Sequence, residues 1–320
     1  MRHPIVVGLC VTMGTALCLL AAWLVGPASA EEEPVTLEVA AKRIPLPTTV
    51  SPELRKVIAA PVPRLDPPET AEAWRKLQRE RDATAAEGAR ALAKALGATI
   101  RPTKVDGVSC YRIVPKDLAP ENGRRLLVHC HGGAYVFNAG EACLTEALLV
   151  AHACKTPVLS VDYRMPPDHP FPAALEDAVA VWKGVHPQHG AANTALFGTS
   201  AGGGLVMATV LRLKELGVPL PGALFVGTPW TDLTKTGDSY FTNAEIDNVL
   251  GRYEGLLHDA ARLYANGKDL SNPLISPVGG NVSDFPPTIL ITGTRDLFLS
   301  NTIRTHRRLR QAGVQADLHV

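Results

Sequence analysis

The sequence predicts an α/β fold in which helices cover both faces of a mainly parallel sheet. From Val105 onward, short apolar runs of strand length alternate with longer segments whose apolar residues recur at helical spacing. Several of the short runs are apolar at nearly every position, which is the pattern of strands buried on both faces of a sheet. Repeated units of one strand and one helix therefore indicate a doubly covered sheet over residues 105–320.

Each expected element follows from one of these patterns. The expected strands cover residues 108–114, 125–130, 157–161, 194–197, 223–226, 288–292 and 316–320. The expected helices between the later strands cover residues 141–153, 172–185, 205–216 and 301–312. Upstream, Ser51-Pro52-Glu53 begins a short helix, and Thr70 begins a longer one that extends to about Leu96. The segment 238–270 interrupts the alternation with helix-like sequence of mixed polarity.

Residues 1–30 have the features of a targeting segment. Arg2 supplies a positive charge, residues 5–25 carry none, and Ala28-Ser29-Ala30 is a small-residue cleavage site. We therefore expect a cleaved signal peptide and a secreted or periplasmic protein. The apolar run is nearly long enough to span a bilayer, so an uncleaved membrane anchor is the alternative.

The overall composition is that of an ordinary globular protein. The net charge is +1 and the isoelectric point is about 7.7, so the chain lacks the basic surface of a nucleic-acid-binding protein. No spacing of cysteine and histidine residues is typical of a metal site. We expect no nucleic-acid partner, no metal and no cofactor, while the oligomeric state stays open.

One short motif predicts a nucleophile. Gly198-Thr199-Ser200-Ala201-Gly202 reads G-x-S-x-G, with an apolar strand before it and a helical pattern after it. A serine at such a strand–turn–helix junction sits in a strained conformation that presents its hydroxyl in front of the sheet. The alternative is a glycine-rich turn in which Ser200 only caps the following helix.

A second glycine motif lies upstream of the serine. The expected strand 125–130 leads directly into His131-Gly132-Gly133. Backbone without side chains lets N–H groups approach a substrate carbonyl oxygen, so the N–H groups of Gly132, Gly133 and Ala201 are expected to form an oxyanion hole. Together the two motifs predict acyl-transfer chemistry.

These two motifs resemble those of the hormone-sensitive-lipase-like branch of the α/β-hydrolases. Further stretches are similar to that branch at residues 160–164, 168–174 and 228–233. The resemblance implies an α/β-hydrolase core over residues 105–320 and a helical cap. It assigns residues 31–104 and an insertion at about 238–270 to this cap. The alternative for the N-terminal helices is that they only pack on the sheet.

The serine needs a base and an orienting acid, which in α/β-hydrolases follow in the order serine, acid, histidine. Asp296 follows the expected strand 288–292 and would lie at the same sheet edge as Ser200. The resemblance places the triad acid in this context, and the alternative is a helix N-cap aspartate.

Only His306 and His319 follow Asp296, and neither position suits a base. His306 lies within an arginine-rich helical pattern, and His319 lies within the last expected strand. The resemblance places the catalytic histidine in the loop after that strand. We therefore expect the natural chain to continue past Val320 and to carry the base there, and the 320-residue chain to have impaired activity.

Other polar residues receive structural interpretations. His131 is expected to position the oxyanion loop through its ring, and His129 to be a hydrogen-bonded core histidine. Asp162 and Arg164 are expected to form an ion pair. Trp230 either packs in the core or lines the acyl or alcohol pocket.

The cysteines allow two outcomes. A hairpin of the expected strands 108–114 and 125–130 would place Cys110 roughly opposite Cys130. An oxidising compartment would then permit a bridge, although buried free thiols are the favoured outcome.

The residues and the resemblance together predict a serine carboxylic-ester hydrolase that acts on short-chain, small-molecule esters. Ser200 is the expected nucleophile and Asp296 the expected acid. A lactone hydrolase is the nearest alternative, because some members of the resembled branch open lactones. A non-catalytic protein that binds a small ligand on the same scaffold is the alternative from another class.

Overall fold

The computed structural model describes residues 36–37, 39, 41, 43–60 and 66–320, and the chain divides into two compact units, 1–49 and 50–320. The described residues of the first unit form neither helix nor strand. The expected signal peptide, residues 1–30, lies outside the described residues. Among the residues that are described, no helix is long and apolar enough to cross a membrane.

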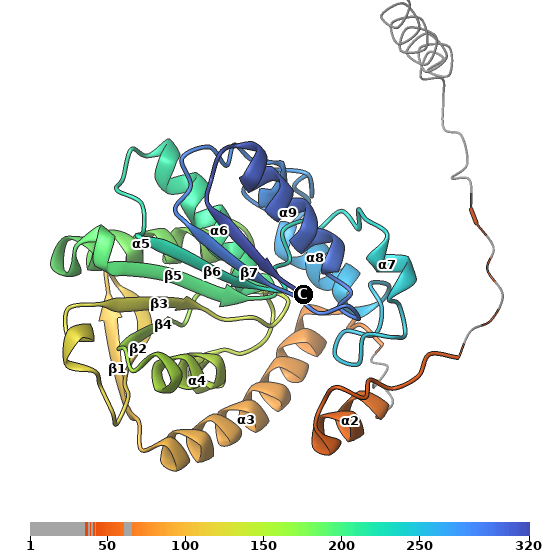
Figure 1. Ribbon diagram of the computed structural model, residues 1–320, viewed down its shortest axis with the longest axis horizontal. Helices are drawn as coiled ribbons and strands as arrows, with labels where there is room; N and C mark the ends of the chain where they lie inside the picture. The colour runs from red at the N-terminus through yellow and green to blue at the C-terminus, as the bar shows by residue number, and fades with distance from the viewer. Residues whose placement is uncertain (1–35, 38, 40, 42, 61–65) are drawn as a thin grey trace, which may run out of the picture. The chain divides into compact units, whose positions relative to one another are not determined.

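The second unit is built on an eight-stranded sheet in the order β1-β2-β4-β3-β5-β6-β7-β8 (Figure 1). The strands are β1 (Thr99–Val105), β2 (Val108–Val114), β3 (Leu126–Cys130), β4 (Val158–Val161), β5 (Thr194–Thr199), β6 (Ala223–Gly227), β7 (Thr288–Ile291) and β8 (Ala316–His319). The β1–β2 and β2–β4 pairs are antiparallel, and the remaining pairs are parallel. The predicted mainly parallel sheet is confirmed.

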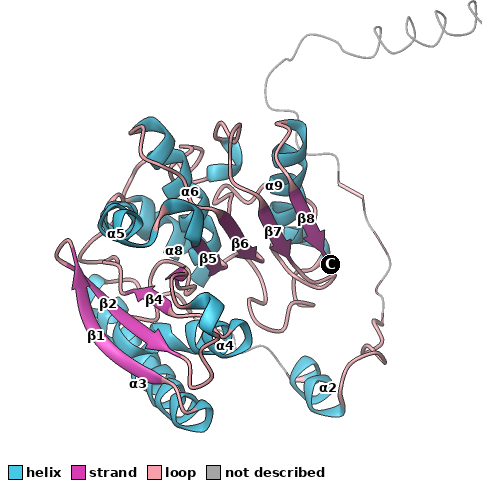
Figure 2. Cartoon of the chain, turned by 60° about the vertical axis from the view of Figure 1, so that its left-hand side comes forward, coloured by secondary structure: helices cyan, strands magenta, loops and turns pink. Residues whose placement is uncertain are grey.

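Helices cover both faces of this sheet, as predicted. The described helices are α2 (Pro52–Ala59), which buries no residue, and α3 (Ala71–Leu96), α4 (Leu144–Cys154), α5 (Ala173–His189), α6 (Ala201–Glu215), α7 (Ser239–Thr242), α8 (Leu256–Ala265) and α9 (Leu299–Gln311), with short 3₁₀ turns at Pro120–Asn122, Gly140–Cys143, Ala191–Asn193 and Pro277–Gly279. One apolar cluster joins α3 and α4 to the sheet, and a larger one joins α5, α6, α8 and α9 to it (Figure 2).

The N-terminal helices begin and end as their sequence predicts. The Ser51 hydroxyl accepts the Leu54 N–H at the start of α2, and the Thr70 hydroxyl accepts the Ala73 N–H at the start of α3. Helix α3 ends at Gly97, whose φ of 62° is the left-handed conformation that glycine adopts readily. Whether α3 and the insertion 238–270 act as a cap stays a prediction.

Strand β1 is an element that the sequence pattern did not reveal. It pairs with β2 through the tight turn Asp106-Gly107, where both residues have positive φ angles of 47° and 84°. Asp-Gly is a strong signal for a two-residue hairpin turn and would have identified this strand. The burial of β1 alternates irregularly because the strand lies at the sheet edge.

The order of the strands decides the state of the cysteines. Strand β4 lies between β2 and β3, so Cys110 and Cys130 both pair with Val161, from opposite sides. The expected hairpin of β2 with β3 is therefore wrong, and both thiols are free and buried. Burial raises the pKa of each of these two thiols to about 12, so they stay protonated at neutral pH.

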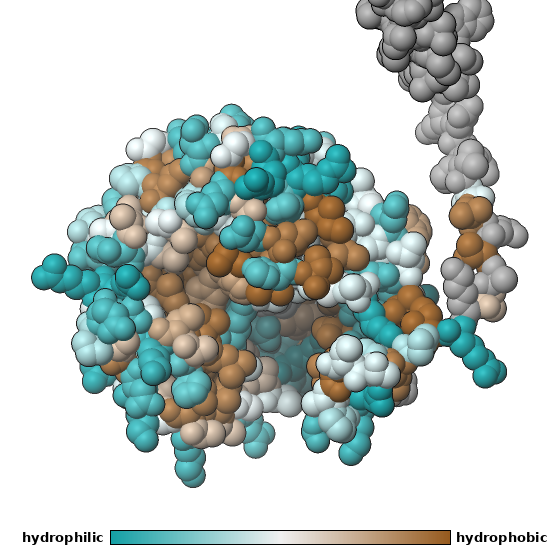
Figure 3. Space-filling model, viewed as in Figure 1, coloured by the Kyte–Doolittle hydropathy of each residue, from teal (hydrophilic) through white to brown (hydrophobic). Residues whose placement is uncertain are grey.

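The far end of the sheet keeps apolar side chains at the surface. Ile289 and Ile291 on β7 are more than a third exposed, although Leu290 between them is fully buried. Figure 3 shows apolar residues gathered around the chain end at β8. Successive residues of a strand point to opposite faces of the sheet. Among the described helices, α9 packs on β7, and it covers one of the two faces of that strand.

Candidate active site

The predicted nucleophile lies on a strained turn between β5 and α6. Ser200 has φ 58° and ψ −125°, a conformation that non-glycine residues rarely adopt. The turn passes so close to β3 that a Cβ atom at Gly198 or Gly202 would lie 2.3 or 2.0 Å from the Cys130 carbonyl oxygen. Glycine is therefore required on both sides of the serine.

Helix α6 begins directly after the serine, at Ala201, and not at 205 as the helical pattern predicted. The three glycines 202–204 are weak helix formers, but packing requires them. A Cβ atom at Gly204 would lie 2.3 Å from the Trp230 carbonyl oxygen. The early start places the N-terminal end of the helix dipole, with its N–H groups, beside Ser200.

The second glycine motif lies against this turn. A Cβ atom at Gly132 would lie 2.9 Å from the Thr199 carbonyl oxygen and 3.5 Å from the Ser200 Cβ. Gly133 has a φ of 118°, and a Cβ atom there would lie 2.4 Å from the Phe137 carbonyl oxygen. The structure thus brings together the two predicted motifs, and each relies on glycine for its conformation.

His131 holds the glycine loop in place. Its Nδ1 lies 2.7 Å from the Gly132 carbonyl oxygen, which also accepts a 3.0 Å hydrogen bond from the Asn138 amide. The ring stacks on Tyr163 with centroids 4.0 Å apart. Burial lowers the pKa of His131 to about 3, so the ring is neutral at pH 7 and its Nδ1–H donates to Gly132.

The candidate acid follows β7, at the edge of the sheet where the serine lies. One oxygen of Asp296 accepts hydrogen bonds from the hydroxyls of Thr228 and Thr292, and the other accepts the Phe298 N–H at 2.7 Å. Thr228 directly follows Gly227, whose carbonyl oxygen accepts the Ser200 N–H at 2.9 Å. The serine and the acid are therefore tied to neighbouring residues at the end of β6.

Burial raises the pKa of the Asp296 carboxyl, although its hydrogen bonds oppose that shift. Helix α9 begins at Leu299 with Phe298 at the N-cap, so Asp296 lies two residues before the cap position. Among the described residues, the Asp296 carboxylate is bonded to the hydroxyls of Thr228 and Thr292 and to the backbone N–H of Phe298. His306 instead bonds the Ala316 carbonyl oxygen at 3.2 Å, and His319 lies at the end of β8, paired with Ile291.

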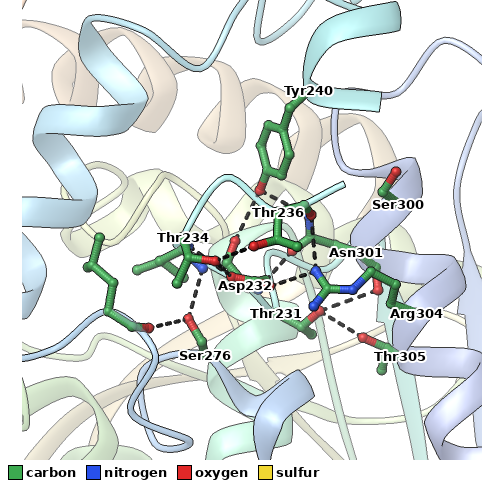
Figure 4. Close-up of polar contacts among 12 residues, drawn as sticks. Thr231, Asp232, Thr234, Thr236, Tyr240, Ser276, Ser300, Asn301, Arg304 and Thr305 are labelled. Carbon is green, nitrogen blue, oxygen red and sulfur yellow. Dashed lines mark hydrogen bonds and ion pairs between the residues drawn. The ribbon is translucent and has the colours of Figure 1, made fainter. Parts of the chain in front are cut away.

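A polar network fixes the loop after β6 to the helix that follows the acid (Figure 4). The Arg304 guanidinium bonds the Asp232 carboxylate at 2.6 Å. Asn301 accepts the Asp232 N–H at 2.7 Å and donates to the Tyr240 hydroxyl at 2.9 Å. Figure 4 shows these side chains, from the loop and from α9, converging on Asp232.

The same loop contacts the serine. The backbone N–H of Trp230 donates to the Ser200 carbonyl oxygen at 2.9 Å. The Trp230 indole is fully buried and stacks on the Phe298 ring, with ring centroids 5.3 Å apart. Of the two interpretations of Trp230, the structure supports packing in the core. The loop, α9 and the nucleophile turn therefore form one packed unit.

Replacing Arg304 by methionine is expected to lower the free energy of unfolding by about 2–3 kcal/mol. Asp232 is only 5% exposed and would lose its cationic partner, whereas the partial exposure of Arg304 limits the loss. Arg307→Met, an exposed arginine on the same helix, is the matched control and is expected to change little. Urea unfolding of both variants checks this, and equal losses would contradict the assigned role of Asp232.

Sequence reasoning missed several partners at the site. Thr228, Thr292 and the Asn243 amide, which bonds the Asp296 carbonyl oxygen at 2.8 Å, were not identified, although Thr228 and Thr292 each directly follow a strand. The expected Asp162–Arg164 pair is wrong. Arg164 bonds Asp177 on α5 at 2.7 Å, and Asp162 accepts the Gly140 N–H. Only the packing of α5 on the sheet brings Asp177 to that position.

The described residues contain no group of three or more side chains able to hold a metal ion. The acids nearest the site, Asp296 and Glu146, are instead bonded to hydroxyls, to a histidine and to a backbone N–H.

Three comparisons relate this chain to known proteins. Residues 127–320 match the model of a family described as the α/β hydrolase fold. The acetyl-hydrolase of Streptomyces hygroscopicus is 34% identical over 203 residues. These residues span 63% of this chain and 66%, just under two thirds, of that protein. The crystal structure of esterase E25 superposes with a TM-score of 0.85 at 45% identity, covering 88% of each chain.

A crystal structure of an esterase from the bacterial hormone-sensitive lipase family is also similar, with a TM-score of 0.68 and 31% identity over 85% of this chain and 88% of that one. This chain therefore belongs to the α/β-hydrolase fold family. The predicted fold class and the resemblance to the hormone-sensitive-lipase-like esterases are confirmed.

Proposed function

We propose that this protein is a serine carboxylesterase that hydrolyses short-chain esters. The observation that carries the proposal is the strained Ser200 turn packed against the two-glycine loop 132–133. A serine hydroxyl beside N–H groups that need no side-chain movement is the arrangement required for attack on an ester carbonyl.

The reaction follows from these parts. The Ser200 Oγ attacks the ester carbonyl carbon while a histidine base removes its proton, and the C=O bond becomes an oxyanion. The N–H groups of Gly132, Gly133 and Ala201 stabilise that oxyanion. It collapses with release of the alcohol, which takes the proton from the histidine, and water then hydrolyses the acyl-enzyme by the same steps.

Asp296 is proposed to orient the histidine and to stabilise its protonated form. The hydrogen bonds from Thr228, Thr292 and Phe298 hold the carboxylate at the sheet edge. That the base lies in a loop following β8, past Val320, stays a prediction, as does impaired activity of the 320-residue chain. Sequencing the gene downstream of the Val320 codon would test the first prediction, and ester turnover by the purified 320-residue chain would test the second.

The preference for short acyl chains is supported by one relative, since an acetyl group is the smallest common acyl group and the S. hygroscopicus protein is named an acetyl-hydrolase. We further propose that the protein acts outside the cytoplasm. This rests on the charge and cleavage pattern of residues 1–30.

Labelling and turnover test the proposal directly. An organophosphonate is expected to modify the full-length protein at Ser200, located by peptide mapping, because Ser200 is the serine that lies against the glycine loop among the residues that the structure describes. Acetyl and butyryl p-nitrophenyl esters are expected to turn over faster than octanoyl and longer esters. Turnover of lactones alone would favour the lactone hydrolase, and tight ligand binding without turnover would favour the binding protein.

A further inference from the structure

A buried serine–histidine–carboxylate arrangement lies close to the turn of the proposed nucleophile. The Ser160 hydroxyl on β4 is 2.9 Å from the His129 Nδ1, and the His129 Nε2 is 3.1 Å from the Glu146 carboxylate on α4. These are hydrogen-bond distances, but the serine bonds Nδ1 and the carboxylate bonds Nε2, the reverse of a catalytic triad. Ser160 and His129 are also completely buried within the sheet, so no substrate reaches them.

This buried chain continues to the nucleophile turn. The second carboxylate oxygen of Glu146 accepts a 2.5 Å hydrogen bond from the hydroxyl of Thr199, the residue directly before Ser200. Glu146 is thus the common acceptor for His129 on β3 and Thr199 on β5, and it joins two neighbouring strands through α4.

Thr199 is also held from the other side. It pairs with Gly227 on β6, where a Cβ atom would lie only 2.8 Å from the Thr199 hydroxyl oxygen. The Gly227 carbonyl oxygen accepts the Ser200 N–H at 2.9 Å. The Thr199 side chain therefore has little freedom, and any shift of it moves the strained residue that follows.

The carboxylate of Glu146 is suited to this contact. Burial raises the pKa of Glu146, but its hydrogen bonds with His129 and Thr199 outweigh this effect, so the pKa is lowered. The carboxylate is consequently ionised at neutral pH. Hydrogen bonds to a charged, mostly buried group are stronger than neutral ones, and losing one leaves an oxygen without its donor.

We infer that Glu146 is a positioning residue for the nucleophile, holding the strained Ser200 turn through the Thr199 hydroxyl while His129 and Ser160 fix the carboxylate. The inference rests on the proposed function of Ser200. Glu146 itself contacts no substrate. It acts only through the conformation of the residue next to the reacting serine.

Two substitutions of Thr199 test the inference. Thr199→Val keeps the shape but removes the hydroxyl, and is expected to lower kcat and the rate of organophosphonate labelling at Ser200 by about tenfold, with KM nearly unchanged. Thr199→Ser keeps the hydroxyl and is expected to retain most of both rates. Labelling of the folded protein reports on the nucleophile itself, which a loss of global stability alone does not slow.

A double-mutant cycle extends the test to Glu146. Glu146→Gln is expected to slow labelling. The double variant Glu146→Gln/Thr199→Val is expected to slow labelling by less than the product of the two single effects. Glu141→Gln is the matched control, because Glu141 lies in the turn before α4 but pairs with exposed Arg90. Should the two single effects multiply, or should Glu141→Gln slow labelling equally, Glu146 would not position the nucleophile through Thr199.

The outcomes separate this inference from the proposed function. A wild-type protein that is not labelled at Ser200 would contradict the proposed function, and the inference with it. A labelled wild type whose rates survive Thr199→Val within about twofold would leave the esterase proposal standing and overturn the positioning role.

Discussion

Replacing Ser200 by alanine is expected to lower kcat for ester hydrolysis by about 10⁶-fold, the loss typical of removing the nucleophile from a serine hydrolase. The glycine loop and the bound substrate geometry remain, so a small rate above that of water is expected to persist. Steady-state kinetics of the full-length variant on a p-nitrophenyl acetate series measures this loss.

Ser200→Gly is the companion variant that separates chemistry from folding. Ser200 has a φ of 58°, which costs a residue with a Cβ atom about 1–3 kcal/mol, and alanine retains that strain. Both variants are therefore expected to be inactive, but only the glycine variant is expected to gain stability in thermal unfolding. Turnover by Ser200→Ala within about tenfold of the wild type would remove Ser200 from its proposed role.

Asp296→Asn is expected to lower kcat by roughly 10³- to 10⁴-fold, because the histidine loses the partner that orients it and stabilises its charge. The amide can still exchange hydrogen bonds with Thr228 and Thr292, so the fold is expected to persist. Asp317→Asn is the matched control, since Asp317 is an exposed acid on the next strand. A loss smaller than about tenfold would leave Asp296 only a structural role.

The pH dependence of Asp296 has a definite sign. Burial raises the pKa of this carboxyl in the folded state, so the ionised form needed for catalysis is lost as pH falls through a value above that of a free aspartate. For stability, a raised acid pKa means that ionisation opposes folding at higher pH. Asp296→Asn is therefore expected to be at least as stable as the wild type at neutral pH.

The local conformations of the site were readable from the sequence. Gly198, Gly202 and the pair Gly132-Gly133 specify backbone paths that a Cβ atom would block, and the alternation of apolar runs specified the mainly parallel sheet. The glycine motifs and the apolar alternation are each visible within a short segment, although the contacts that require three of these glycines come from Cys130 and Thr199, about 70 residues away.

The tertiary structure decided which distant residues meet. Placing β4 between β2 and β3 kept Cys110 apart from Cys130, and the packing of α4 on the sheet brought Glu146 to Thr199. Two partners of Asp296, Thr228 and Asn243, likewise come from the distant segment that follows β6. Strand order and helix docking depend on the packing energy summed over the whole core. No short segment of the sequence indicates that sum by itself.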